Sequence, residues 1–234
     1  MTTPQAVPGN APLNVGLMVP ANNTTMKAEL EAWLPQGSTV VQVKIPRGEG
    51  LLTAETIPAY RDRAIALARE HFTGTGLDLL AYGCTAAGFI SGPAGDADLA
   101  KKLADATGLP VVTTARAMVN ALQHERTTRV AVVTPYLDAV NRQLEAFLAS
   151  GGIGVVRLAS FRAPDVGALG RITAEQVREL ARATMGDDCD ALFIGCSQLP
   201  TYAILEGLEA EFGRPAWSSI RATAWDVMRQ HAAH

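Results

Sequence analysis

The stretch DLLAYGCT at Asp78–Thr85 decides the fold, because the chain repeats its pattern as DALFIGCS at Asp190–Ser197. Each copy begins with Asp, continues with four apolar residues and ends in Gly-Cys followed by a hydroxyl residue. Short apolar runs bounded by turn residues predict strands that are buried on both faces of a parallel sheet. Each cysteine is then expected at the carboxyl end of its strand, which is the edge where open α/β sheets bind ligands.

Two further landmarks recur in the same order as the cysteine strands. VGLMVP at Val15–Pro20 is similar to VAVVTP at Val130–Pro135, and TTARA at Thr113–Ala117 is similar to SSIRA at Ser218–Ala222. Repetition of several landmarks at nearly one offset indicates an internal duplication. Strands that alternate with helices predict right-handed βαβ units. We therefore expect an α/β protein with two similar lobes, each a flavodoxin-like parallel sheet flanked by helices, related by a pseudo-two-fold with the site between them.

The same pattern suggests how the chain is divided. Residues 1–12 are expected to be a disordered tail, residues 13–115 the first lobe and residues 116–218 the second lobe. A last helix over residues 219–234 is expected to return to the first lobe. The Gly- and Pro-rich segment 88–95 is predicted to be a connection without regular structure.

Composition limits the partners that the chain can have. The 234 residues carry a net charge of −3, with 48% apolar and 18% charged residues, so we expect neither nucleic acid nor a membrane surface as partner. No secretory signal is expected, and three cysteines are an odd set, which favours reduced thiols in the cytoplasm. No histidine has metal-ligand spacing, and no Gly-x-Gly-x-x-Gly motif is present, so neither a metal nor a nucleotide cofactor is predicted.

Cys84 and Cys196 are the candidate reactive groups. A thiol at a helix N-terminus is favoured as the nucleophilic thiolate, and adjacent hydroxyls and N–H groups can hold a carboxylate. A single cysteine at a strand end is more often a small buried core residue than a reactive group. Two cysteines at equivalent positions of a repeat favour a functional role. Cys189 lies among aspartates and is interpreted as structural. Arg47, Arg116 and Arg221 are candidate carboxylate partners, although solvated arginines are commoner. Neutral polar residues fall at the same predicted edge and suit a small anionic ligand: Asn22, Asn23, Thr85, Thr113, Thr114, Thr134, Tyr136, Ser197, Ser218 and Ser219.

Several motifs resemble those of one superfamily. The paired Gly-Cys-Thr and Gly-Cys-Ser motifs resemble the aspartate/glutamate racemase superfamily, and GCSQLP at 195–200 is similar to the second cysteine motif of its amino-acid racemases. VPANNTTM at 19–26 resembles the N-terminal motif of maleate cis–trans isomerases, and TPYLDAVN at 134–141 is similar to a segment of arylmalonate decarboxylases. The resemblance implies the two-lobed fold and chemistry without a cofactor.

The resemblance also implies roles for individual residues. Cys84 matches the nucleophile of maleate isomerases, and Cys196 matches the second thiol. Asn23 matches the substrate-binding asparagine, Tyr136 the carboxylate-binding tyrosine and Thr85 the dioxyanion-hole threonine of the decarboxylases. We expect Pro20, Thr134 and Ser197 to complete the substrate-binding set. The chain departs from both branches: decarboxylases usually have glycine where Cys84 stands, and Val166 stands where maleate isomerases carry asparagine.

These features predict an isomerase that acts on a small carboxylate or dicarboxylate, by maleate-type cis–trans isomerisation with Cys84 as nucleophile. A second hypothesis is a racemase in which Cys84 and Cys196 act as an acid/base pair on opposite faces of the substrate. An arylmalonate-type decarboxylase, a non-catalytic two-lobed carboxylate-binding protein, and a sensor whose cysteines respond to oxidants also fit the pattern. A homo-oligomer, either a dimer or a tetramer, is expected.

Overall fold

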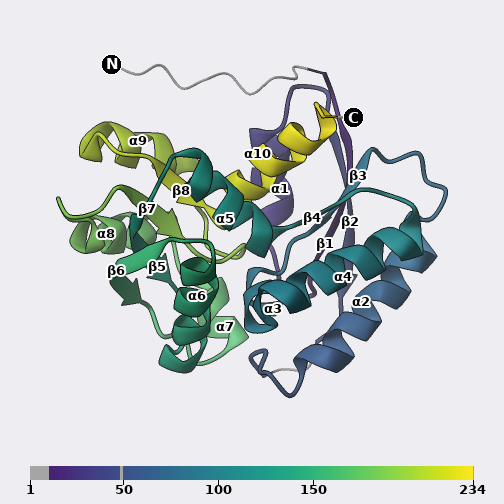
Figure 1. Ribbon diagram of the computed structural model, residues 1–234, viewed down its shortest axis with the longest axis horizontal. Coiled ribbons are helices and arrows are strands. Elements are labelled where there is room, and N and C mark those ends of the chain that lie inside the picture. Colours follow the sequence, from purple (N-terminus) through teal and green to yellow (C-terminus); the bar gives the residue numbers. More distant parts are fainter. Residues whose placement is uncertain (1–10, 48–49, 234) are drawn as a thin grey trace.

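The protein consists of two lobes, each built on a four-stranded parallel sheet (Figure 1). The computed structural model describes residues 11–47 and 50–233, so the predicted tail lies almost wholly outside the described residues. The first sheet has the order β2-β1-β3-β4, and the second has the matching order β6-β5-β7-β8, which confirms the predicted two-lobed α/β fold. The strands are β1 (Asn14–Pro20), β2 (Thr39–Ile45), β3 (Leu79–Tyr82), β4 (Val111–Thr113), β5 (Arg129–Thr134), β6 (Gly154–Ser160), β7 (Ala191–Ile194) and β8 (Ala216–Ser218).

Helices flank both sheets, and α2 and α4 lie side by side on the outer face of the first lobe (Figure 1). No helix in the described part of the chain is long and apolar enough to cross a membrane. The helices are α1 (Met26–Trp33), α2 (Ile57–Phe72), α3 (Thr85–Ile90), α4 (Gly92–Thr107), α5 (Thr114–His124), α6 (Asp138–Ser150), α7 (Val166–Gly170), α8 (Ala174–Thr184), α9 (Tyr202–Phe212) and α10 (Ser219–His231).

The repeated aspartates at the head of the cysteine strands hold neighbouring strands in register. The Asp78 carboxylate accepts a 2.6 Å hydrogen bond from the Asn14 N–H at the start of β1. The Asp190 carboxylate accepts bonds from the N–H groups of Thr128 (3.0 Å) and Arg129 (2.8 Å) at the start of β5. Burial alone would raise the pKa of Asp190, but these hydrogen bonds outweigh it and lower the pKa to about 2.

The lobes meet along α5 and α10, whose Thr114 and Thr223 hydroxyls lie 2.9 Å apart. A second contact joins the same helices where the Asn120 amide donates to the Asp226 carboxylate at 3.1 Å. Helix α5 spans the predicted boundary at residue 115, and α10 packs against α1, β3 and β4 of the first lobe. The two sheets are therefore fixed relative to each other by a buried helix pair.

The prediction that segment 88–95 lacks regular structure is wrong. It forms the end of α3 and the start of α4, and Ser91 separates the two helices. Gly92, the first residue of α4, has a φ of +68°, which breaks the helical path. Pro93 stands in the first turn of α4, where its missing N–H leaves no intrahelical bond unmade. A Cβ at Gly88 would lie 2.5 Å from the Ala115 Cβ, so this glycine allows α3 and α5 to pack closely. Composition indicated a loop, but these residues serve helix packing.

Candidate active site

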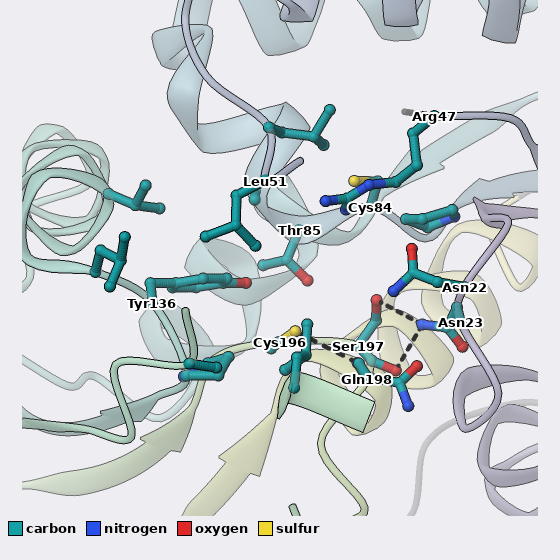
Figure 2. Close-up of a pocket in the computed structure, with 18 residues that line it drawn as sticks. Asn22, Asn23, Arg47, Leu51, Cys84, Thr85, Tyr136, Cys196, Ser197 and Gln198 are labelled. Carbon is teal, nitrogen blue, oxygen red and sulfur yellow. Dashed lines mark hydrogen bonds between the residues drawn. The ribbon is translucent and has the colours of Figure 1, made fainter. Parts of the chain in front are cut away.

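Cys84 and Cys196 line one pocket between the lobes (Figure 2). Each follows a buried cysteine strand by one glycine, since β3 ends at Tyr82 and β7 ends at Ile194. Cys84 has an extended backbone and occupies the N-cap of α3. Cys84 is 4% exposed and Cys196 is 8% exposed, so both sulfur atoms belong to a largely enclosed space.

The glycine before Cys84 is required by packing. A Cβ at Gly83 would overlap the Met26 sulfur and lie 3.0 Å from the Met18 carbonyl oxygen. The Gly83 N–H donates to that same oxygen at 2.7 Å, which continues the ladder one residue beyond β3. Gly83 thus sets the position of Cys84.

The predicted substrate-binding residues Asn23 and Ser197 both line the pocket, but their side chains are occupied by other protein groups. The Asn23 amide donates to the Ser197 carbonyl oxygen at 3.0 Å, and its own oxygen accepts from the N–H groups of Thr25 (3.1 Å) and Met26 (2.9 Å). The Ser197 hydroxyl donates to the Gly83 carbonyl oxygen at 2.7 Å. These bonds join the loops after β1, β3 and β7.

Gln198 reinforces this junction, and the sequence alone did not indicate it. Its side-chain oxygen accepts from the Thr24 N–H at 2.9 Å, and its amide donates to the Thr24 hydroxyl at 2.9 Å. The Thr25 hydroxyl donates to the Gln198 carbonyl oxygen at 2.9 Å. A glutamine after a cysteine motif carries no sequence signal for such a role.

Four buried polar atoms that belong to pocket-lining residues have no hydrogen-bond partner within the described chain. They are the Thr85 hydroxyl, the Tyr136 hydroxyl, the Arg47 Nε and the Asn22 side-chain oxygen. Burial, followed by the neighbouring Cys196 thiol, raises the pKa of Tyr136 well above its usual range, so this phenol stays protonated as a donor. Buried polar groups are normally paired, so three donors facing one cavity suit an anionic ligand.

Both thiols are held predominantly protonated at neutral pH. Burial raises the pKa of Cys84 to about 11, although the Ala87 N–H, the Tyr60 hydroxyl and the Arg47 charge all oppose the rise. Burial also raises the pKa of Cys196, against opposing contributions from the Gln198 N–H and the Tyr136 hydroxyl. The expectation that a helix N-terminus makes Cys84 a ready thiolate is therefore wrong, because desolvation of the anion is the larger effect.

Several predicted edge residues lie outside the pocket lining. Thr134 donates from its hydroxyl to the Asn141 side-chain oxygen at 2.6 Å, and the Asn141 amide donates to the Tyr136 carbonyl oxygen at 3.1 Å. We correct its assignment accordingly: Thr134 holds the Tyr136 loop and does not face the pocket. Helix caps and interlobe contacts occupy Thr113, Thr114 and Ser218. The Ser219 hydroxyl is buried outside the pocket lining and has no hydrogen-bond partner in the described chain.

The other residues singled out from the sequence lie either in the pocket lining or outside it. Pro20 lines the pocket, as predicted. Cys189 is buried in the second-lobe core, outside the pocket. Arg221 stacks between Trp33 and Trp217, with its guanidinium carbon 5.0 Å from each ring centroid, and so is committed to packing. No group of three or more His, Cys, Asp or Glu side chains in the described residues is placed to hold a metal ion.

Apolar side chains form the rest of the wall. One side comes from the loop after β2 and from α3, and the other comes from the second lobe near α6 and α7. These residues are Leu51, Leu52, Ala86, Pro135, Leu137, Val140, Ala163 and Leu169. An apolar wall lowers the local dielectric and strengthens the interaction of a bound anion with the few donors present.

The relatives of this two-lobed chain define its class as cysteine-dependent isomerases and decarboxylases. Residues 15–234 match the arylmalonate decarboxylase family, so the chain belongs to that family. It is 28% identical over 229 residues to a maleate isomerase of Nocardia farcinica, covering 92% of this chain and 88% of that one. It is 32% identical over 184 residues to an arylmalonate decarboxylase of Bordetella bronchiseptica, covering 78% and 76%.

A solved structure extends the comparison. The Nocardia farcinica maleate cis–trans isomerase, as a cysteine-to-serine mutant with a covalently bound succinylcysteine intermediate, superimposes with a TM-score of 0.84 at 25% identity. The match covers 94% of this chain and 92% of that chain. The two-lobed arrangement is thus shared by this chain and a maleate isomerase over nearly their whole lengths.

Proposed function

We propose that this protein is a cofactor-independent cis–trans isomerase of a small unsaturated dicarboxylate of the maleate type, with Cys84 as the nucleophile. The main supporting observation is that the Cys84 thiol shares one pocket with the hydroxyls of Thr85 and Tyr136, neither of which has a hydrogen-bond partner within the described residues. A sulfur nucleophile beside donors without partners suits addition to a double bond that is conjugated to a carboxylate.

The proposed reaction has three steps. The reacting form is the Cys84 thiolate, which is the minor form at neutral pH. Its sulfur forms a bond to one alkene carbon, and the π electrons move onto the carboxylate at the far carbon, giving an enediolate. Thr85 and Tyr136 donate hydrogen bonds to this dianion while the new single bond rotates. The electrons then return, the carbon–sulfur bond breaks, and the trans product leaves with the Cys84 thiolate restored. Cys196 lies on the same pocket and is assigned to hydrogen-bond or protonate the intermediate.

Two findings about relatives support addition as the reaction. Four curated maleate isomerases match this chain, each over 92% of its length. The covalent succinylcysteine intermediate in the Nocardia relative is the species that results from sulfur addition to a four-carbon unsaturated diacid. Racemisation is the second candidate, and it is favoured by one observation: both thiols reach the same pocket and so could exchange a proton with one substrate carbon.

Proton NMR in heavy water separates these functions in one experiment. Maleate incubated with the protein is expected to lose its vinyl signal as the fumarate signal grows, with Cys84→Ser at least about 10³-fold slower. Cys189→Ser, which changes a buried thiol outside the pocket, is the matched control and is expected to retain activity. Deuterium at the α-carbon of an amino or hydroxy acid would instead establish racemisation. Turnover that survives in Cys84→Ser would overturn the assignment of the nucleophile.

A further inference from the structure

Arg47 is the sole charged side chain among the described residues that line the pocket. It lies two residues after the end of β2, and Figure 2 shows its guanidinium beside the Cys84 sulfur and near Asn22, whereas Tyr136 lies on the opposite side of the pocket. Its charge also lowers the pKa of both Cys84 and Cys196, which supports a position close to the two thiols. The cation is therefore placed at the reacting end of the cavity.

The arginine is held in place by a hydrogen bond, and no carboxylate of the described residues neutralises it. One terminal nitrogen donates to the Gly50 carbonyl oxygen at 2.6 Å, and Arg63 fixes the adjacent backbone by donating to the Pro46 carbonyl oxygen at 3.1 Å. Arg47 Nε is buried and has no partner in the described chain, and no carboxylate there pairs with this residue. A partly desolvated guanidinium without an acidic partner favours binding of an external anion, and its planar fork fits a carboxylate.

When sulfur adds to an unsaturated diacid, the two carboxylates of the substrate have different roles and need different binding groups in the pocket. The carbon that sulfur attacks carries one carboxylate, which must lie near Cys84 and keeps its single charge. The other carboxylate receives the displaced electron pair and becomes the enediolate that Thr85 and Tyr136 are proposed to hold. Arg47 stands beside Cys84, on the side where the first carboxylate must lie (Figure 2).

We propose that Arg47 binds the carboxylate on the carbon that Cys84 attacks, and thereby restricts this site to dicarboxylates. This inference rests on the proposed function, since it assigns the substrate class of the same pocket. A monocarboxylate would engage the hydroxyl end only and would leave the guanidinium without a counterion. The arginine therefore acts as the specificity-determining residue.

Binding of non-reactive acids tests this assignment without turnover. Calorimetry with succinate and butyrate, which have four carbons and no double bond, compares two carboxylates with one. Wild type is expected to bind succinate more tightly than butyrate. Arg47→Gln is expected to weaken succinate binding by about 10- to 100-fold and leave butyrate unchanged, as loss of a charged hydrogen bond predicts. Arg47→Lys is expected to bind succinate with an affinity between those of wild type and Arg47→Gln, because lysine keeps the positive charge but lacks the planar guanidinium.

Lys44→Gln is the matched control, because it removes one positive charge from the exposed part of β2, outside the pocket. It is expected to bind both acids as wild type does. Equal affinity for succinate in wild type and Arg47→Gln, an equal loss for both acids, or no succinate binding by wild type would each overturn the inference. Because succinate cannot isomerise, a protein that binds it through Arg47 but leaves maleate unchanged would contradict the proposed function alone.

Discussion

The Ser197 hydroxyl donates a 2.7 Å hydrogen bond to the carbonyl oxygen of Gly83, so the residue after one pocket cysteine is tied to the residue before the other. The bond is buried and joins positions 114 residues apart in the chain. Asn23 donates to the Ser197 hydroxyl at 3.3 Å and to its carbonyl at 3.0 Å, which brings the loop after β1 into the same junction. The separation of the two sulfur atoms is therefore set by a specific interlobe bond as well as by general packing.

Replacing Ser197 by Ala tests this bond. The Gly83 oxygen then loses a buried donor, and we expect kcat for isomerisation to fall about 10-fold or more because reacting groups shift out of alignment. The unfolding free energy is expected to fall by about 1 to 3 kcal/mol. Ser150→Ala removes a hydroxyl at the end of α6, outside the pocket, and should leave kcat unchanged. Unaltered turnover in Ser197→Ala would show that the junction does not position the thiols.

Tyr136 provides a second prediction. Tyr136→Phe removes one of the donors assigned to the enediolate while leaving the ring contact with Phe89, whose centroid is 5.5 Å away. We expect kcat to fall by about 10²-fold, which is the scale for loss of one oxyanion donor. Tyr202→Phe, at a 44% exposed position outside the pocket, is the control. A change confined to KM would assign Tyr136 to ground-state binding instead.

The Cys84 thiol is expected to titrate at high pH. With its pKa raised to about 11, alkylation of Cys84 in the ligand-free protein should accelerate as pH rises through about 9 to 11, because the thiolate is the reactive form. Site-resolved mass spectrometry after labelling with iodoacetamide measures this rate for each cysteine. A plateau below about pH 9 would contradict the dominance of burial.

Tyr60 modulates this titration from behind the pocket. Its buried hydroxyl lies beside Cys84 and opposes the rise in the thiol pKa. Tyr60→Phe is therefore expected to raise the Cys84 pKa further and to slow alkylation at about pH 9, without changing the pocket lining. Tyr202→Phe again serves as control, and faster alkylation in Tyr60→Phe would reverse the sign of this argument.

Asp190 predicts a pH-dependent contribution to stability. Its pKa is about 2 in the folded protein and near 3.8 when unperturbed, so the stabilisation is present above pH 3.8 and is lost as pH falls toward 2. Asp190→Asn should lower the unfolding free energy at about pH 7 by about 1 kcal/mol, discounted for solvent exposure, and Tm by about 2 to 4 °C. The deficit should shrink between about pH 4 and pH 2. Exposed Asp187→Asn is the control in the same thermal-unfolding series.

The repeated strand motifs predicted two parallel sheets, with Cys84 and Cys196 at one shared site, because buried parallel strands leave a strong apolar signature. Segment 88–95 and α7 were not anticipated, since glycine content and a five-residue helix give no usable periodicity. The roles of Asn23 and Ser197 also escaped prediction, because hydrogen bonds between residues more than 170 positions apart have no local pattern. Arg47 and Asn22 were among the predicted candidates, but nothing in the sequence separated Arg47 from Arg116 and Arg221. The homo-oligomer stays a prediction.

Duplication has left the two halves with unlike hydroxyls at one equivalent position. Thr85 faces the cavity without a partner in the described chain, whereas Ser197 is fixed between Gly83 and Asn23. The cavity is consequently lined unequally by two lobes that share one strand order. Under the proposed function, the two carboxylates of a cis diacid would therefore meet different groups in it.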